Sequence, residues 1–591
     1  MIIRLMDRNR FPVLAAMVLY LLIQGLTFRT GVGMEEFRDL WMIRAMEASR
    51  LPLRDFVVEY GPVGPFFWYG VTRLIGTELF AIRLISVLMG LPILWLSCCV
   101  ANRLLQDRWA VAAIGFCASG LVSFPLYSYT HVLSVLTLLA ALLSAVRLLE
   151  SGFIGWHLFC ALLSIVTVFI RPLPTGIVLV GTVLTVLLLS PTHGNNLRSN
   201  RALTVIIYGI IVIVGVVAGV VGYAVVAGFP VERWYALTFV SGSPLLTGNL
   251  LLLAPRLPNP VVALVSFWMD IMTCWTCGVV ILAYKTGALL NLLAGHIAYL
   301  VAFVVPAAAF TWLAARRIFP SAAPIENSGT LWLLSICSLG LGLHYHNVVT
   351  EPFHQGIKSG GYIWNTVGGF LLQPGLIIGL ALTYRLTVRI RLFRYAGRRL
   401  ENTLFVPRLI IGVFAAYLVL APKLQNLRYL AVPMVTTDLP GVRGLYLNNY
   451  FEKATLPAIE HLQDNRDEMP DHLFSPLPVC TYLASQEPAF PEYYYTGLWG
   501  DDSIIIGATF PGMEVTGPIT LGEFILWRLA RLKPIVVLDS PVADYSPVRE
   551  ATYAWTQYVS ENYVLHHTFV SENPITSEVG SSSVYVYLPD E

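Results

Sequence analysis

Long apolar segments alternate with short polar ones from the N-terminus to about residue 422. A bilayer core about 30 Å thick needs roughly 20 apolar residues per helix, and on this rule the pattern predicts about thirteen membrane-spanning helices. The expected spans begin near Phe11, Ala81, Trp109, His131, Ile154, Thr175, Thr204, Ala236, Val261, Leu289, Thr330, Ile363 and Leu404. The stretch "SGSPLLTG" interrupts the span near Ala236, so the pattern leaves open whether residues 236–254 cross the membrane.

Beyond residue 423 the pattern becomes that of a water-soluble segment. Helix-like stretches ("FEKATLPAIEHLQDN", "TLGEFILWRLARL", "VREATYAWTQYVSENY") alternate with strand-like ones ("HLFSPLP", "PIVVLDS", "SSSVYVYLPD"). The fold class expected is therefore a polytopic α-helical membrane protein with a C-terminal α/β domain. We place the multi-span domain over residues 1–423 and the α/β domain over residues 424–591.

Composition and charge agree with this division. Hydrophobic residues make up 56% of the 591 residues, and the mean hydropathy of +0.67 exceeds what a soluble chain needs for its core. Residues 424–591 contain 21 Asp and Glu against 8 Lys and Arg. The long apolar spans make membrane lipids expected partners. The sequence has no basic surface with interleaved aromatic residues, so nucleic acid is not expected as a partner.

Basic segments between the spans predict the topology. The segments "HGNNLRSNR", "AARRIF" and "RLTVRIRLFRYAGRRLEN" are expected in the cytoplasm by the positive-inside rule. All three lie there only if the interrupted segment near Ala236 does cross. The N-terminus is then cytoplasmic, residues 31–80 form a long outer loop, and residues 424–591 are extracytoplasmic, with the inner (cell) membrane as the expected location.

Candidate chemistry concentrates in this first outer loop. In "MEEFRDLWMIRAMEASR" the acids Glu35, Glu36 and Asp39 have helical spacings of three and four, so a helix would place them on one side. We expect the acidic pair on a hydrated loop, where neutralising either glutamate costs little stability. The alternative is a solvated helix start that the helix dipole favours.

The order of motifs from this loop onward resembles the GT-C superfamily of membrane glycosyltransferases. These enzymes, such as protein O-mannosyltransferases and lipid A aminoarabinose transferases, take sugars from polyprenyl-phosphate carriers. They carry an acidic pair after the first span, a "yrDf" stretch, a "yGPl" turn and an arginine near the start of the second span. Here these read "EE", "LRDF", "EYGP" and "FAIRLISVL". The likeness continues through "YSYTHVLSVL" and "FIRPLPTG", where many relatives have a lysine and this chain has Arg171.

The resemblance implies an enzyme: a hexosyl- or pentosyl-type glycosyltransferase that acts in glycosylation of the cell envelope. It would move a sugar from a polyprenyl-phosphate-linked donor to an acceptor hydroxyl or amine on the outer face, the acceptor being a lipid, a glycan or a protein. Two alternatives stay open. One is a non-catalytic transporter or flippase of lipid-linked sugars, and the other is a polysaccharide polymerase or ligase.

This reaction requires a base beside the incoming group and cations beside the departing phosphate. We predict Glu35 and Glu36 as the catalytic residues. The predicted substrate-binding residues are Asp39, Asp55, Glu59, Tyr60, His131, Arg171, Arg233 and Lys358. Arg171 is the leading phosphate ligand because Pro172 and Pro174 fix a tight turn around it; the alternative is a snorkelling arginine at the end of a span.

Several candidates have a plain alternative role. Asp55 and Glu59 can cap helices, and Arg233 and Lys358 can be ordinary interfacial residues. Asp270 lies either inside a span, where it would face a cavity or a partner, or at a span boundary. The sequence assigns no metal site, but some relatives bind a divalent cation through loop acids, so Mg²⁺ or Mn²⁺ is the cofactor that the resemblance allows.

Overall fold

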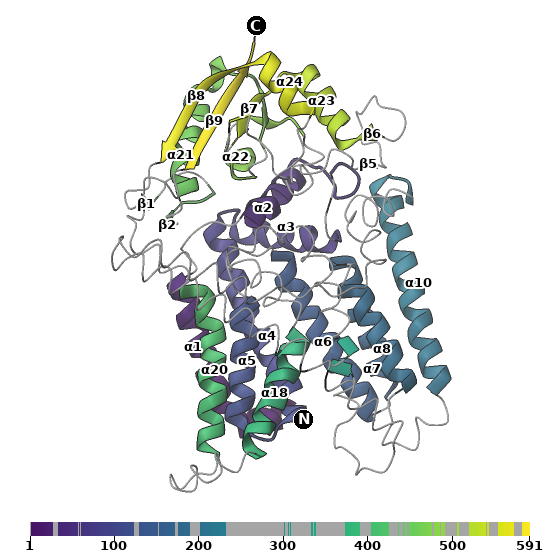
Figure 1. Ribbon diagram of the computed structural model, residues 1–591. Helices are drawn as coiled ribbons and strands as arrows, with labels where there is room; N and C mark the ends of the chain where they lie inside the picture. The colour runs from purple at the N-terminus through teal and green to yellow at the C-terminus, as the bar shows by residue number, and fades with distance from the viewer. Residues whose placement is uncertain are drawn as a thin grey trace.

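The computed structural model of the chain contains a bundle of long helices and, at one end of it, a five-stranded sheet with its own helices (Figure 1). The residues that the structure describes are 2–27, 34–56, 58, 61–122, 129–151, 153–171, 175–189, 201–231, 301, 305, 308, 333–334, 336–337, 373–389, 404–424, 435–436, 441–443, 446–447, 450–475, 478–484, 486–490, 505–506, 519–538, 541–542, 554–571 and 582–590.

The bundle is built from the apolar segments of the sequence. Its described helices are α1 (Ile2–Thr27), α4 (Leu79–Leu104), α5 (Arg108–Val122), α6 (Tyr129–Ser151), α7 (Ile154–Ile170), α8 (Ile177–Leu189), α10 (Arg201–Ala227), α18 (Gln373–Arg389) and α20 (Phe405–Leu424). An apolar segment in lipid forms a helix because the helix satisfies every backbone N–H and C=O group within the segment itself.

These helices agree in place with eight of the predicted spans. The helices α4 to α8, α10 and α20 begin within three residues of a predicted start, and α1 contains Phe11. By length and composition, Leu79–Leu104, Thr130–Glu150 and Leu203–Ala227 are long and apolar enough to cross a membrane, among the described residues. The predicted starts at Ala236, Val261, Leu289, Thr330 and Ile363 lie outside the described residues, so the span count stays a prediction.

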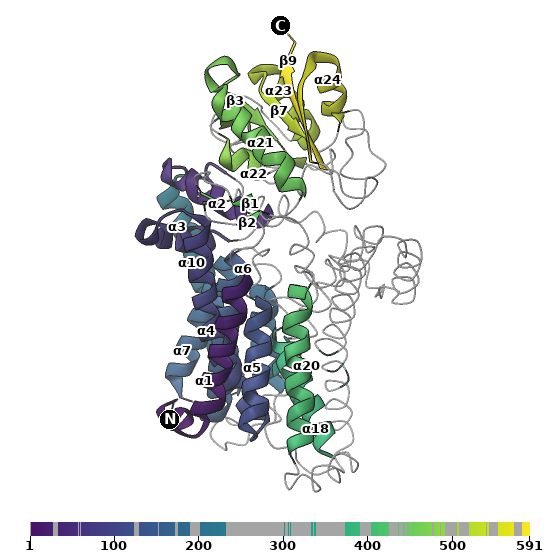
Figure 2. The same cartoon turned by 90° about the vertical axis from the view of Figure 1, so that its left-hand side faces the viewer.

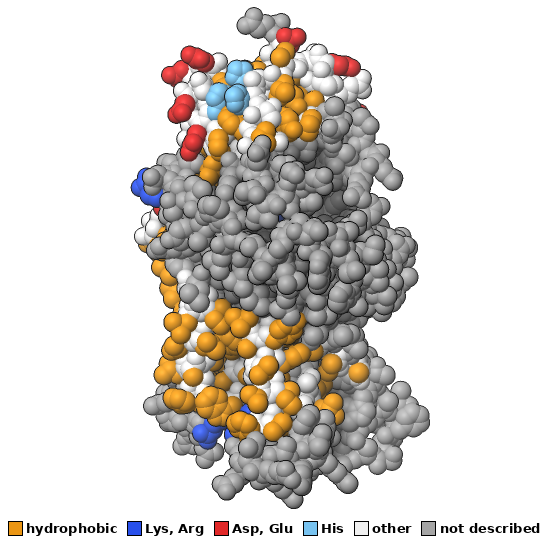
Figure 3. Space-filling model, turned by 60° about the vertical axis from the view of Figure 1, so that its left-hand side comes forward, with side chains coloured by type: hydrophobic (Ala, Val, Ile, Leu, Met, Phe, Trp, Pro, Cys, Tyr) orange, Lys and Arg blue, Asp and Glu red, His pale blue; other side chains and the backbone are white. Residues whose placement is uncertain are grey.

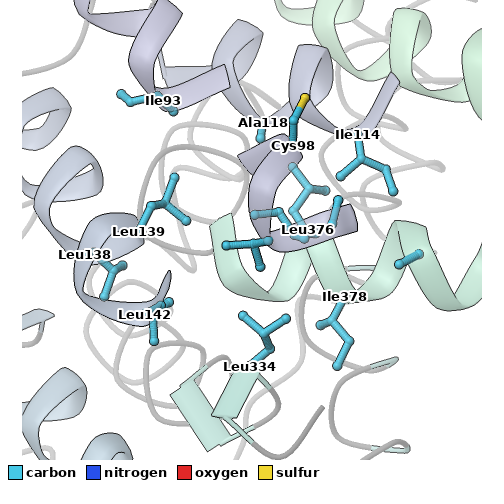
Figure 4. Packing of buried hydrophobic residues seen from close by; sticks show 14 of the residues in the cluster. Ile93, Cys98, Ile114, Ala118, Leu138, Leu139, Leu142, Leu334, Leu376 and Ile378 are labelled. Carbon is cyan, nitrogen blue, oxygen red and sulfur yellow. The ribbon is translucent and has the colours of Figure 1, made fainter. Parts of the chain in front are cut away.

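Helix α5 lies in the middle of the bundle, where it packs against α1, α4, α18 and α20. Its face toward α4 includes Gly115, where an added Cβ atom would lie 2.3 Å from Sγ of Cys98, so the two helices can approach this closely only with glycine at that position. Figure 4 shows Cys98, Ile114, Leu376 and other apolar side chains from α4, α5, α6 and α18 filling the space between the helices.

The outer helices present apolar side chains outward. In the most apolar part of α10 only 11% of the residues are buried inside the protein. The side chains of this helix that are at least half exposed include Ile206, Ile210, Ile213, Val217 and Val225. Figure 3 shows hydrophobic side chains gathered over the bundle, with acidic ones over the C-terminal part above it. This surface is typical of a protein whose helices face lipid.

The five-stranded sheet is mixed, with the order β4-β3-β7-β9-β8. The strands are β3 (His472–Phe474), β4 (Glu487–Pro488), β7 (Ile535–Leu538), β8 (Tyr563–Ser571) and β9 (Ser582–Pro589), and the helices around them are α21 (Tyr450–Asp464), α22 (Pro478–Leu483), α23 (Leu521–Leu532) and α24 (Ala554–Asn562). Short strand pairs are β1 (Val435–Thr436) with β2 (Tyr446–Leu447) and β5 (Ile505–Ile506) with β6 (Ile519–Thr520). A 3₁₀ turn spans Arg466–Glu468.

The central strand β7 runs parallel to β3 and antiparallel to β9. All four of its residues are buried, as expected for a strand covered on both faces. Helix α21 packs on the β8 and β9 pair, and α23 packs against α24. The helix-like and strand-like stretches quoted from the sequence contain β3, α23, β7, α24 and β9, and all of α21 except its first residue. The domain boundary at residue 423 stays a prediction.

The two ends of the bundle differ. Helix α4 begins beside the C-terminal part, where the Leu79 amide donates to Gly441 O (2.9 Å), and ends at the opposite end, where the N-terminus also lies (Figures 1 and 2). In the turn there, Asp107 Oδ2 accepts hydrogen bonds from Tyr384 Oη (2.6 Å) and Arg408 Nε (2.7 Å). Burial alone would raise the pKa of Asp107, but these hydrogen bonds hold it below its usual range.

Candidate active site at the end of the bundle beneath the sheet

The predicted outer loop, residues 31–80, contains two helices, α2 (Met34–Glu47) and α3 (Val63–Ile75), which lie between the bundle and the C-terminal sheet (Figure 1). The helix predicted over the acidic pair is therefore confirmed. The predicted hydration of the acidic pair is wrong for Glu36, which is 0% exposed, and Asp39 on the same helix is 2% exposed. The apolar side chains of α2 belong to one buried cluster with residues of α3, α4 and the C-terminal part, and this packing takes both carboxylates out of water.

Glu36 is held by an arginine from the bundle. Arg83, near the start of α4, donates from Nε to Glu36 Oε1 (2.8 Å) and from Nη2 to Oε2 (2.5 Å), and its side chain is 3% exposed. Both carboxylate oxygens thus accept from one planar guanidinium, the geometry that makes arginine pairs strong and directional. This bidentate ion pair fixes α2 to α4.

The residues after Glu36 add more buried charge. Arg38 Nε lies 3.2 Å from Asp39 Oδ1, and both side chains are almost fully buried. His131, at the start of α6 and 3% exposed, lies within electrostatic range of Arg38 and Arg171. The structure therefore brings three predicted substrate-binding residues, Asp39, His131 and Arg171, to the same end of the bundle as Glu36.

Arg171 ends α7 and is only 7% exposed. Its amide donates to Thr167 O (2.8 Å), and its own carbonyl accepts from the Gly176 amide (2.9 Å), which closes the turn between α7 and α8. Pro172 and Pro174, which the sequence places in this turn, lie outside the described residues. The guanidinium is enclosed by protein rather than extended from a helix end into water.

The "YGP" turn packs directly against the residue before Arg171. The Gly61 amide donates to Ile170 O (2.9 Å). A Cβ atom at Gly61 would lie 1.8 Å from Phe169 O, so only glycine permits this approach of two backbones. Three residues later, a Cβ atom at Gly64 would lie 2.7 Å from the side chain of Thr130. These two glycines thus hold the start of α3 against the end of α7 and the start of α6.

Asp55 lies in a tight turn of the same loop and is engaged locally. Its Oδ2 atom accepts from the Leu51 amide (2.6 Å), and both its oxygens lie 2.9 Å from Arg54 Nε. Leu53, in the same turn, is fully buried with φ +63. Asp55 therefore closes a turn and caps no described helix, and its role in acceptor binding stays a prediction.

Other predicted residues cannot be placed. Glu59, Tyr60, Arg233 and Lys358 lie outside the described residues, as does Asp270. Glu35 belongs to the first turn of α2, but its side chain is outside the described part of the structure.

The described carboxylates do not fit a metal site. Glu36, Asp39 and Asp55 each pair with an arginine. Within the described part of the chain, no group of three or more His, Cys, Asp or Glu is arranged to hold a metal ion. A Mg²⁺ or Mn²⁺ site that used Glu35 or Glu59 stays a prediction.

The sequence did not single out Arg38 or Arg83 as candidates. Arg83 entered only as part of the "FAIRLISVL" motif. Its position inside an apolar span was the available signal, because an ionisable residue there needs a partner or a cavity. Arg38 had no such signal, since an arginine next to acidic residues in a loop is ordinarily a solvated one.

One family model matches part of the chain. Residues 59–218 match the family model described as dolichyl-phosphate-mannose-protein mannosyltransferase. The matched region includes Arg83, His131 and Arg171 and begins after the acidic pair. None of the curated proteins searched matches the chain.

The solved structures that match the chain include three structures of two proteins. ArnT from Cupriavidus metallidurans in the apo state is 16% identical, with a TM-score of 0.45 over 99% of this chain and 98% of that chain. ArnT from Cupriavidus metallidurans bound to undecaprenyl phosphate is 14% identical, with a TM-score of 0.46 over 98% of each chain. The oligosaccharyltransferase of Archaeoglobus fulgidus, tethered to an acceptor peptide, is 12% identical, with a TM-score of 0.46 over 98% of this chain and 74% of that chain.

These TM-scores are below 0.5, so they do not decide the assignment. The family-model match covers residues 59–218 and agrees with the motif order of residues 31–80. The matched segment contains Arg83, His131 and Arg171, which lie at the end of the bundle beneath the sheet. Over residues 59–218 the chain is similar to membrane glycosyltransferases of this family.

Proposed function

We propose that the chain transfers a sugar from a polyprenyl-phosphate carrier to an acceptor hydroxyl or amine at the end of the bundle beneath the sheet. One observation carries the proposal: the helix with the acidic pair and the turn with Arg171 lie at this same end, beside the "YGP" turn. The matching family is named for a dolichyl-phosphate-mannose donor and a protein acceptor. The transferred group is a hexose or a pentose, and the acceptor is a lipid, a glycan or a protein.

The reaction balances without a redox partner. The acceptor oxygen or nitrogen forms a bond to the anomeric carbon, and the bond between that carbon and the phosphate oxygen breaks. The polyprenyl phosphate leaves with the electron pair, and the acceptor proton passes to a carboxylate. Both oxygens of Glu36 already accept from Arg83, so we assign the proton to Glu35 and the fixing of α2 to Glu36.

Arg171 is assigned to the phosphate of the donor, with His131 and Arg38 near it. Negative charge grows on the phosphate as the bond to the sugar breaks, and a buried arginine stabilises that charge more strongly than a hydrated one. A protein-enclosed guanidinium at 7% exposure supports this role over that of a snorkelling residue.

Arg171→Ala is expected to lower kcat at saturating donor by about 10². The exposed Arg73 in the last turn of α3 is the matched control, and Arg73→Ala should leave kcat unchanged. The measurement is release of polyprenyl phosphate by the purified variants. If Arg171→Ala kept wild-type activity, Arg171 would be a snorkelling residue at the end of a span. Arg233 or Lys358 would then be the next candidates for binding the donor phosphate.

The proposed reaction is tested by incubating the purified protein with a set of defined polyprenyl-phosphate sugars and an acceptor mixture. Transfer predicts that polyprenyl phosphate is released in step with glycosylated acceptor. A transporter or flippase would instead move the intact donor across a vesicle membrane without releasing polyprenyl phosphate. A polysaccharide polymerase would lengthen a glycan chain with every turnover.

The proposed location is the inner membrane, with the N-terminus in the cytoplasm and residues 424–591 outside. Supporting this topology, the start of α1 and the C-terminal sheet lie at opposite ends of the bundle (Figures 1 and 2). We expect reporter fusions at Gly194 and Gly397 to give cytoplasmic signals and a fusion at Glu591 an extracytoplasmic one. A cytoplasmic signal at Glu591 would contradict both the topology and an outer active site.

A further inference from the structure

The C-terminal part contacts the helix of the acidic pair through α22, and Tyr482 makes two of these contacts. Arg44 of α2 donates from Nη1 to Tyr482 O (2.7 Å). The Tyr482 ring lies against the ring of Phe37, with 5.8 Å between centroids and 46° between planes. Phe37 directly follows Glu36 and is 1% exposed. The backbone and the ring of Tyr482 thus both contact α2, at two points about two helical turns apart.

Tyr482 also lies against the segment that holds the start of α4. Gly441 has φ +90, which a residue with a side chain rarely adopts. Its carbonyl accepts from the amide of Leu79, the first residue of α4 (2.9 Å). A Cβ atom at Gly441 would lie 3.1 Å from Cε1 of Tyr482, so ring and backbone are in close contact. Tyr482 therefore packs next to the two helices that the Glu36 and Arg83 pair joins.

We infer that Tyr482 is a positioning residue: the C-terminal part holds α2, and with it the acidic pair, in its working place on the bundle through this side chain. The inference rests on the proposed function for what the acidic pair does. It goes beyond that function because it gives the C-terminal part a role in the sugar-transfer step.

The expected loss of rate follows from how tightly the Tyr482 ring is packed against α2. Tyr482 is only 9% exposed, so removal of its ring leaves a space beside Phe37 into which α2 can move. A displacement of about 1 Å at a reacting group can lower a rate by about 10²-fold. Burial raises the pKa of Tyr482 to about 12, so the hydroxyl stays neutral in any ordinary assay. The Tyr482→Phe variant keeps both the ring that contacts Phe37 and the carbonyl that accepts from Arg44.

The experiment compares three variants of the full-length protein. Tyr482→Ala removes the ring, and Tyr482→Phe removes only the hydroxyl. Leu529→Ala truncates a fully buried side chain of α23, outside the contact with α2, and controls for a general loss of stability in the C-terminal part. Two quantities are measured for each variant: amide hydrogen exchange of α2, and kcat and KM for release of polyprenyl phosphate.

The expected result is specific to Tyr482→Ala. Its α2 amides should exchange at least tenfold faster, and its kcat should fall tenfold to a hundredfold with KM for the donor within about threefold of wild type. Tyr482→Phe and Leu529→Ala should match wild type in both measurements.

Three results would overturn the inference: unchanged exchange of α2 in Tyr482→Ala, faster exchange with unchanged kcat, or the same losses in Leu529→Ala. Failure of the proposed function is distinguishable. The wild-type protein would then release no polyprenyl phosphate from any donor, and the exchange of α2 would by itself decide whether Tyr482 holds the helix.

Discussion

Glu35→Gln is expected to lower the rate of sugar transfer by a factor of about 10² or more while the protein keeps its thermal stability. Glutamine preserves the size and hydrogen-bonding shape of the side chain but cannot take a proton from the acceptor. The partner residue Glu36 cannot replace it, because both of its oxygens accept hydrogen bonds from Arg83. The rate is measured as release of polyprenyl phosphate at saturating donor and acceptor, and stability as thermal unfolding in the same detergent.

The matched control is an acid on the same helix. Glu47 is the last residue of α2 and is exposed, so Glu47→Gln changes the charge of the helix without touching the buried cluster. It should transfer sugar at the wild-type rate. If Glu35→Gln also did so, the acidic pair would be no more than a helix start, and the assignment of the base would fail.

The helices of the bundle could be predicted from the sequence because their signal is local. An apolar stretch long enough for the bilayer predicts a span whatever it packs against, and α4, α5 and α7 begin within two residues of the predicted starts. In the C-terminal part the same holds for α21 and α23, whose apolar positions recur at helical spacing.

Strand β8 was not predicted. It follows α24 without a break, so no turn residue marks its start. Its register against β9 shifts between Leu565 and His567, and this irregularity interrupts the alternation by which a strand is recognised. It is also the edge strand of the sheet, with Val564 and Leu565 about half exposed, so burial adds no clear pattern.

The candidate site could be predicted only in part, because its contacts join residues far apart in the sequence. The acidic pair, His131 and Arg171 were found from motif order. Their surroundings were not: nothing local shows that the first loop packs beneath residues that come some 400 positions later, as the contact between Arg44 and Tyr482 does. The predicted hydrated loop was wrong for this reason.

Burial of Glu36 changes what a substitution there should do. In Glu36→Gln the guanidinium of Arg83 loses its carboxylate while its side chain stays almost fully enclosed. Removing one partner of a buried ion pair leaves an uncompensated charge, and the free energy of unfolding is expected to fall by about 3 to 5 kcal/mol. Glu35→Gln, on the same turn of α2, serves as the comparison and should unfold like the wild type.

The double variant separates the lost ion pair from any other effect at Glu36. Glu36→Leu with Arg83→Met replaces both charges by apolar groups of similar volume, an exchange that is often neutral because no charge is then left buried. It should therefore recover most of the stability that Glu36→Leu or Arg83→Met loses alone, although α2 is no longer held by a directional contact. Thermal and denaturant unfolding of the four proteins gives the coupling energy between the two residues. Equal unfolding of wild type and Glu36→Gln would mean that the pair adds no net stability, and packing alone would then hold α2 on the bundle.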